Sequence, residues 1–161
     1  MALKADRHEK HTDISFFYDA GTATRGGCVV LDAVNASGAA MDQAANQVKY
    51  KLGTSSDVPI GILLNDVVNK DLTRTHLNYY KNEVQKGSKV TIMTEGWVVT
   101  SNVTGTPSPG DLAYVDDAGT AGNVTNVVDP TLSGVLCIGR FMSNKDADGY
   151  AKVAVNLPNF G

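Results

Sequence analysis

Few side chains in this sequence are placed to do acid–base or metal chemistry. The three histidines are His8, His11 and His76. His8 and His11 are three residues apart, but the sequence around them offers no third ligand, and a zinc site needs three or four. The Gly-x-Ser-x-Gly and His-Glu-x-x-His motifs of hydrolases are absent. We therefore expect the chain to be no enzyme and to use no metal and no cofactor.

Two stretches resemble ligand-binding loops only in part. Residues 21–28 have the glycine spacing of a phosphate-binding loop, but Gly27 and Cys28 replace the lysine and the Ser/Thr that such a loop requires. Residues 144–149 begin like a calcium loop, with the pattern Asn-x-Asp-x-Asp-Gly, yet Val155 occupies the twelfth position in place of glutamate. Because Asn, Asp and Gly also favour tight hairpin turns, we expect a turn at 144–149.

The two cysteines, Cys28 and Cys137, each lie in an apolar run. Free cysteine is among the most often buried residue types, so the sequence favours two reduced, buried thiols. A disulfide between them stays open, because strands that are distant in sequence can be neighbours in space.

Composition indicates one soluble, β-rich, non-secreted domain. The chain has 161 residues, a net charge of −3, 42% hydrophobic and only 19% charged residues. The near-neutral charge and the scattered Lys and Arg residues argue against a nucleic-acid binder, whose affinity depends on neutralising phosphates. No apolar run approaches the roughly 20 residues that span a bilayer, so we expect no membrane contact.

The hydrophobic pattern predicts a mainly β fold, a compact antiparallel β-barrel or sandwich. Short apolar or alternating runs are separated by turn residues about every 8–12 positions, as in such folds. Strands are expected at 28–31, 47–52, 59–68, 89–92, 96–100, 112–115, 124–128, 135–142 and 150–157. At most one short helix is expected, at about 71–87, between a possible N-cap at Asp71 and a closing Gly87. Residues 1–25 are interpreted as an extended N-terminal arm, and residues 26–161 as the β-rich domain.

Aromatic and apolar side chains provide the candidate contact residues. Ile14, Phe16, Phe17 and Tyr18 form a dense apolar patch in the arm, and three adjacent aromatics are costly to leave in water. They could pack on their own domain or anchor the arm to a partner. Trp97, Tyr79 and Tyr80 are further candidates for an interface, with a core position as the alternative for Trp97.

The order of strands and turns in the second half resembles the capsid decoration (cement) proteins of tailed bacteriophages. The segments that carry the resemblance are Thr94–Val99, Pro109–Val115, Gly134–Met142 and Asp148–Val155, preceded by Gly26–Val30 and Pro59–Leu64. In that family, acidic-Gly, Pro-Gly-Asp and Asp-Gly turns connect the strands of a compact barrel. The resemblance extends over about residues 26–158.

This resemblance implies a structural virion protein that binds the outer surface of a phage head and stabilises the capsid across subunit joints. The implied partners are the major capsid protein and neighbouring copies of the chain, as a homotrimer, with no nucleic acid and no membrane. The implied location is the outer surface of the virion, after synthesis in the bacterial host cytoplasm. The alternative is a carbohydrate-binding or adhesive module of a fibre or spike, with Trp97, Tyr79 and Tyr80 as exposed aromatics.

Overall fold

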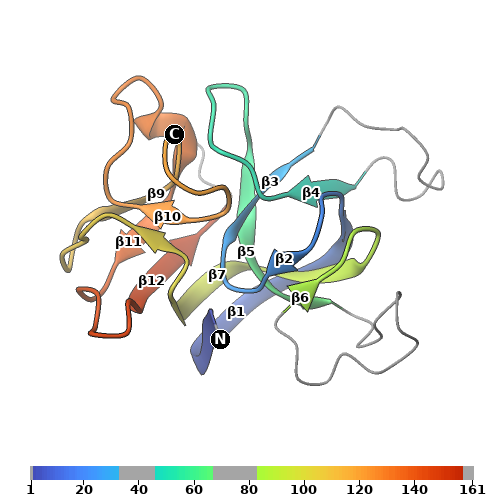
Figure 1. Cartoon of the computed structure of the whole chain (residues 1–161), viewed down its shortest axis with the longest axis horizontal. Helices are drawn as coiled ribbons and strands as arrows, with labels where there is room; N and C mark the ends of the chain where they lie inside the picture. The colour runs from blue at the N-terminus through green and yellow to red at the C-terminus, as the bar shows by residue number, and fades with distance from the viewer. Residues whose placement is uncertain (1, 33–45, 67–82, 158–161) are drawn as a thin grey trace.

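The computed structural model describes residues 2–32, 46–66 and 83–157, and these form a mainly β structure (Figure 1). This confirms the predicted fold class. The strands are β1 (Leu3–Tyr18), β2 (Ala23–Thr24), β3 (Cys28–Leu31), β4 (Gln47–Lys49), β5 (Pro59–Asp66), β6 (Glu83–Val84), β7 (Lys89–Thr100), β8 (Val103–Thr104), β9 (Leu112–Val115), β10 (Val124–Thr125), β11 (Cys137–Phe141) and β12 (Ala151–Asn156).

Most strands belong to one sheet with the order β1-β4-β3-β5-β7-β12-β11-β9-β10-β8. β1 also pairs with β7, so the pairings β1–β4–β3–β5–β7 return to β1 and form a closed cycle. β7 is long enough to pair with β5 through Val90–Met93 and with β12 through Glu95–Thr100. The second half of the sheet, from β12 to β8, therefore extends from the end of β7 (Figure 1).

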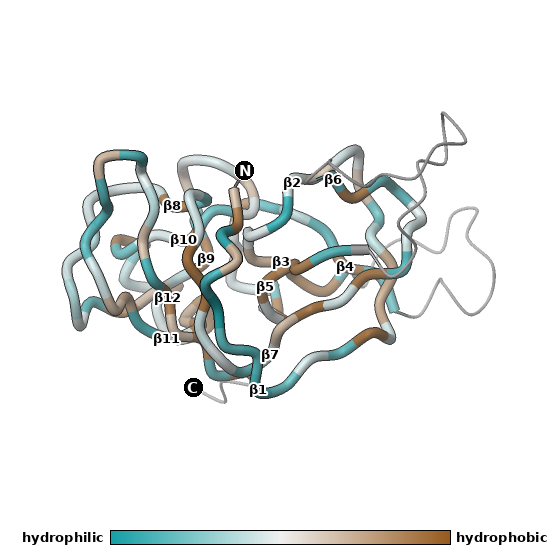
Figure 2. The backbone as a smooth tube through the Cα atoms, turned by 90° about the horizontal axis from the view of Figure 1, so that it is seen from below, coloured by the Kyte–Doolittle hydropathy of each residue, from teal (hydrophilic) through white to brown (hydrophobic). Residues whose placement is uncertain are grey.

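The sheet separates two hydrophobic cores, and the central strands contribute to both. In β5, Ile62 and Leu64 point into the first core and Leu63 points into the second. In β7, Met93 belongs to the first core and Ile92 to the second. Side chains alternate between the two faces of a strand, so a strand buried on both faces must be apolar throughout. This explains why Ile62, Leu63 and Leu64 are consecutive apolar residues in β5, a segment that Figure 2 shows in brown.

β1 lies unusually close to β7 at one point, and glycine makes this possible. Gly96 has φ +145°, and a Cβ atom at this position would lie 2.0 Å from the carbonyl oxygen of His8. Its register partner on β1 is Glu9. A side chain here would push the two strands apart, so Gly96 fixes the approach of β1 to the sheet.

The N-terminal segment is tied to the sheet along most of its length. Leu3–Tyr18 forms β1, hydrogen-bonded to β7, and β2 pairs with β6 in a small second sheet. The first core includes Leu3 and the second includes Tyr18. The two ends of β1 are thus buried, whereas its middle is exposed.

The helical prediction needs a correction at its C-terminal end. Residues 71–82 lie outside the described part of the chain, but Glu83 and Val84 form β6 instead of a last helical turn. Val84 is fully buried in the second core and pairs with Ala23, and this burial outweighs local helix propensity. The single helix of the described residues is α2 (Ser133–Leu136), and the strand expected at 135–142 begins two residues later, at Cys137.

Candidate binding surface

A row of side chains crosses the exposed face of the sheet. Leu112 on β9 pairs with Arg140 on β11, Arg140 with Ala154 on β12, and Ala154 with Trp97 on β7. Residues directly opposite each other on paired strands point to the same side of the sheet. Their neighbours in sequence point inward and are buried: Ala113, Phe141, Val153 and Val98. We call the exposed side the outer sheet face, made of Leu112, Arg140, Met142, Lys152, Ala154 and Trp97.

Trp97 is held on this face by a cation–π contact. The Nζ atom of Lys152 lies 3.4 Å from the centroid of the indole ring. Trp97 is half-buried and therefore belongs neither to the core nor fully to solvent. Such a contact contributes about 0.5–1 kcal/mol at an exposed site. It places the positive charge of Lys152 over one face of the indole ring.

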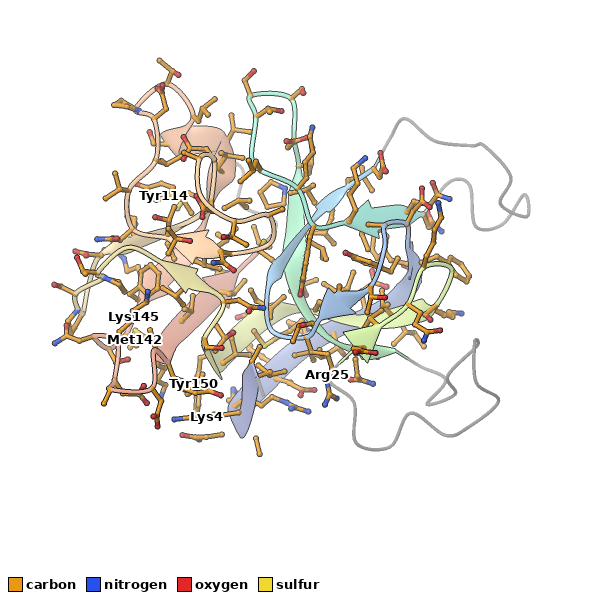
Figure 3. All side chains as sticks on the ribbon, viewed as in Figure 1. Lys4, Arg25, Tyr114, Met142, Lys145 and Tyr150 are labelled. Carbon is orange, nitrogen blue, oxygen red and sulfur yellow. The ribbon has the colours of Figure 1, made fainter. Side chains whose placement is uncertain are left out.

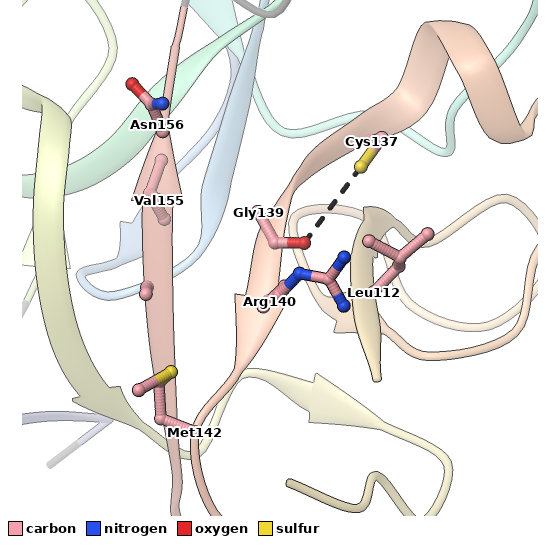
Figure 4. A pocket seen from close by; sticks show the side chains of 8 residues that line it. Leu112, Cys137, Gly139, Arg140, Met142, Val155 and Asn156 are labelled. Atoms are coloured by element: carbon pink, nitrogen blue, oxygen red, sulfur yellow. Dashed lines mark hydrogen bonds between the residues drawn. The ribbon is translucent and has the colours of Figure 1, made fainter. Parts of the chain in front are cut away.

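Next to Trp97, the outer sheet face contains a shallow apolar depression of about 360 Å³ (Figure 4). Leu112 and Met142 line it and are 39% and 55% exposed. The guanidinium of Arg140 also lines it and donates a hydrogen bond from Nη1 to the carbonyl oxygen of Gly110, at 2.7 Å. Arg140 is thus oriented before any partner binds. Exposed methionine and arginine near a tryptophan are typical of a protein–protein interface.

Charged side chains of β1 border this face. Glu95 on β7 accepts a hydrogen bond from Lys10 and lies 3.4 Å from Nε2 of His11. The hydrogen bond from Lys10 lowers the pKa of the Glu95 carboxyl, with a smaller contribution from the charge of His11. At the other end of β1, Lys4 lies between Asp146, at 3.0 Å, and the ring of Tyr150, at 4.1 Å (Figure 3). These contacts fasten the strand to its neighbours at both ends of its exposed part.

The structure distributes the predicted contact residues over different environments. Ile14 is 53% exposed, and Phe16 and Phe17 are half-buried. Tyr18 is only 2% exposed and packs edge-on against Tyr50, with ring centroids 5.8 Å apart. Its side chain is therefore inside the second core. Tyr79 and Tyr80 lie outside the described residues.

The outer sheet face brings together residues that the sequence prediction missed. Trp97 was predicted as a contact residue, but Leu112, Arg140 and Met142 were not. The available signal was alternation, because Arg140 and Met142 flank the buried Phe141, and Leu112 precedes the buried Ala113. Knowing which strands are neighbours, however, requires the structure.

The calcium-like stretch at 144–149 forms a turn, as expected. Oδ1 of Asp146 accepts hydrogen bonds from the backbone N–H groups of Asp148 and Tyr150, at 3.0 and 2.8 Å. The bond from Tyr150, followed by that from Lys4, lowers the pKa of Asp146. The carboxylate thus shapes the hairpin between β11 and β12. Across the described residues, no group of three or more His, Cys, Asp and Glu side chains is arranged to hold a metal ion.

A second hollow, of about 560 Å³, lies beside Asp116. Burial alone would raise the pKa of Asp116, but hydrogen bonds donated by Thr104 Oγ1 and by the backbone N–H groups of Thr120, Gly119 and Ala118 lower it. These donors use both carboxylate oxygens, at 2.6–3.2 Å. Asp116 therefore organises the loop after β9 and has no free oxygen for a ligand.

Cys28 and Cys137 form no disulfide in the structure, which answers the question that the sequence left open. Cys28 is fully buried in the first core, and burial raises the pKa of its thiol to about 12. Cys137 is partly exposed beside the depression, with Sγ 4.0 Å from the carbonyl oxygen of Gly139 (Figure 4). The expectation of two buried cysteines thus holds for Cys28 only.

In the part of the chain that is described, no helix is long and apolar enough to cross a membrane.

Comparison with known proteins agrees with a surface that binds another protein. A search of curated protein sequences gave no significant match. One protein family does match, over residues 11–156, and is described as structural cement protein (E217 gp24/Pam3 gp6). The match covers nearly the whole chain and confirms the resemblance found in the sequence. The chain belongs to this family of phage structural cement proteins, and it is a structural protein of the virion capsid.

Proposed function

We propose that this cement protein binds the major capsid protein on the outside of the head through the outer sheet face. The observation that carries the proposal is the apolar depression between Leu112 and Met142, lined also by a pre-oriented Arg140 and by Ala154, the register partner of Trp97. Large apolar side chains that are exposed next to each other on a rigid sheet gain free energy when a partner covers them.

The rigid support of this face suits a protein that stabilises a shell. Each outward residue is backed by a buried neighbour of the first core, such as Phe141 behind Arg140. Little side-chain or backbone freedom is then lost on binding, which improves affinity for a given contact area. Because many copies bind one head, modest affinity per copy is enough to add contacts across the joints between capsid subunits.

Ile14 and Phe17 remain candidates for a contact with a neighbouring subunit at the far end of β1. Ile14 is more than half exposed, and Phe17 is partly covered by Lys89, whose Nζ lies 5.9 Å from the ring centroid. Tyr18 is not included in this surface, because its side chain is buried within the chain. That copies form a homotrimer, bind no nucleic acid or membrane and catalyse no reaction stays a prediction, as does their synthesis in the host cytoplasm.

The alternative of a glycan-binding module has less support. A sugar-stacking aromatic needs an open ring face, and Lys152 covers one face of Trp97. The other two aromatics of that hypothesis, Tyr79 and Tyr80, lie outside the described residues. The family match adds weight to capsid binding.

Met142→Asp tests the proposed surface, with Val127→Asp as its matched control. Both side chains are exposed, 55% and 70%, and both substitutions add the same charge, but Val127 lies outside the outer sheet face. Binding to purified undecorated heads is measured by co-sedimentation over a range of protein concentrations. We expect Met142→Asp to weaken binding by at least about 30-fold, the effect of an unpaired charge in an apolar contact, and Val127→Asp to bind normally.

Equal thermal unfolding of both variants and the original chain excludes misfolding as the cause of a loss. Normal binding by Met142→Asp, or an equal loss in Val127→Asp, would show that the head is bound through another surface.

A further inference from the structure

The middle of β1 is a strand that its own domain does not cover. Residues 5–12 are all exposed, although successive side chains point to opposite faces. One edge of β1 pairs with β7, and among the described strands the other edge meets only β4, at Phe17 and Tyr18. Within residues 2–32, 46–66 and 83–157, no strand pairs with the first part of that edge, so its backbone N–H and C=O groups have no strand partner there. An open edge of this kind is a template for pairing with another strand.

The charges of β1 are complementary to those of a second β1 strand that runs in the opposite direction. Arg7 and Glu9 lie one residue to either side of His8 and carry opposite charges. Asp6 and Lys10 lie two residues to either side and also carry opposite charges. In an antiparallel pair of two β1 strands centred on His8, Arg7 of each copy lies opposite Glu9 of the other. Asp6 of each copy likewise lies opposite Lys10. Opposite charges in such positions stabilise a strand pair, and like charges destabilise it.

No other symmetric register places these charges as well. In an antiparallel pair, residues that face each other point to the same side of the sheet. A symmetric pair of β1 strands must therefore place one residue directly opposite the same residue of the other copy, at the two-fold axis. Centring on Asp6, Arg7, Glu9 or Lys10 puts identical charges opposite each other. Centring on Ala5 matches one pair of charges, Lys4 with Asp6. Centring on His8 satisfies both pairs and places no two Lys or Arg residues, and no two Asp or Glu residues, opposite each other.

From these observations, we propose that two copies of this chain pair through the exposed edges of β1, antiparallel and symmetric about His8. The shape of β1 limits this contact to a few residues. The register of β1 against β7 is irregular between Leu3 and Arg7 and again between Glu9 and His11, so the regular ladder spans Arg7–Glu9, and the Asp6–Lys10 charge pairs lie just beyond its two ends. Irregularities on either side twist the edge away and prevent a longer ladder, which restricts the edge to a closed pair.

This pairing goes beyond capsid binding and uses a different part of the molecule. The outer sheet face lies on β7, β12, β11 and β9, whereas the paired edge faces away from β7 (Figures 1 and 2). One copy can therefore bind the shell and a neighbouring copy at the same time. The contact joins copies in twos, so it is compatible with homotrimers only if it links different trimers.

The first test is a symmetric crosslink. His8→Cys is made in a Cys137→Ser background, because Cys137 is partly exposed and Cys28 is fully buried. Opposite Cα atoms in an antiparallel pair are about 4.5–5.5 Å apart, which a disulfide can span. The control is Thr12→Cys, whose two copies would be about 27 Å apart in this register. We expect His8→Cys to form a disulfide-linked dimer under mild oxidation, in solution and on heads, and Thr12→Cys to form none.

The second test separates pairing between copies from the Arg7–Glu9 ion pair within one copy. Arg7→Glu and Glu9→Arg each place like charges opposite each other in a self-pair, and each should reduce His8→Cys crosslinking about tenfold. When the two variants are mixed, the glutamate introduced at position 7 of one chain faces the arginine introduced at position 9 of the other. Mixed dimers should therefore recover to the original level. Mixing cannot restore an ion pair within a chain.

The proposal is overturned if His8→Cys does not crosslink, if Thr12→Cys crosslinks equally, or if mixing gives no recovery. Head binding is scored separately on Met142→Asp with His8→Cys. Crosslinking that persists when head binding is lost supports both surfaces, and normal head binding by this variant refutes the outer sheet face alone.

Discussion

The close approach of β1 to β7 predicts a large cost for a single methyl group at Gly96. In Gly96→Ala, the new Cβ would lie 2.0 Å from the carbonyl oxygen of His8 and 3.0 Å from Sδ of Met93. The backbone oxygen cannot move unless β1 shifts. The positive φ of Gly96 adds a second, independent penalty of about 1–2 kcal/mol for any L side chain.

Gly149→Ala is the matched control, because Gly149 also has a positive φ, +83°, but a Cβ atom at this position would meet no other atom within 4 Å. It should show the backbone penalty alone, about 1 kcal/mol. Overpacking typically adds about 1–3 kcal/mol, so Gly96→Ala should lose about 3 kcal/mol in total. For a chain of this size, these losses correspond to a lower Tm by about 2–4 °C for Gly149→Ala and about 6–12 °C for Gly96→Ala.

The assay is urea unfolding followed by tryptophan fluorescence, combined with limited trypsin digestion. If β1 is displaced in Gly96→Ala, cleavage after Lys4, Arg7 or Lys10 should become faster than in Gly149→Ala. Equal free energies of unfolding for the two variants would refute the idea that Gly96 is required for the approach of β1.

Two further predictions concern polar side chains that make several hydrogen bonds. Asp116→Asn should destabilise the fold by about 2 kcal/mol at pH 7, because it removes the charge and one of the two acceptor oxygens of Asp116. Since the pKa of Asp116 is lowered on folding, its contribution is present above about pH 4 and is lost as the pH falls further, so the difference in urea midpoint should shrink by pH 3. Tyr50→Phe should cost about 1–2 kcal/mol in thermal unfolding, because the Tyr50 hydroxyl donates to the Thr24 carbonyl oxygen at 2.7 Å and accepts from Gly27 N–H at 2.9 Å. A Tyr50→Phe variant of unchanged stability, or an Asp116→Asn effect that is independent of pH, would contradict these assignments.

The sequence was sufficient for the fold class because strand periodicity and turn chemistry are local. The run at 59–68 was recognised as a buried strand from its apolar residues, and residues 59–66 form β5. Why that run is apolar throughout was not predictable. It depends on Leu63 facing one core and Ile62 the other, and the existence of two cores follows from pairings between distant strands.

The aromatic patch shows where local information misleads. Phe16, Phe17 and Tyr18 are adjacent in sequence and were therefore grouped as one anchor. In a strand they alternate, so Tyr18 enters the second core and Phe16 packs against it, while Phe17 contacts Lys89. Conversely, Leu112 is distant in sequence from Arg140 and Met142, and the three form one surface only because β9 and β11 are neighbours.

β7 is the element on which both proposed contacts depend. It carries Trp97 on the outer sheet face, and it hydrogen-bonds to β1 along the edge opposite β5 and β12. Val98 and Met93 anchor it in the first core, and Ile92 and Val90 anchor it in the second. A mechanical force between the capsid shell and a neighbouring copy would therefore be carried by the backbone hydrogen bonds of β7. To separate β7 from β1 or from β12, several backbone hydrogen bonds must break together, and the first core, which contains Leu3 of β1 and Val153 of β12, must open. This is the mechanical property that a cement protein needs.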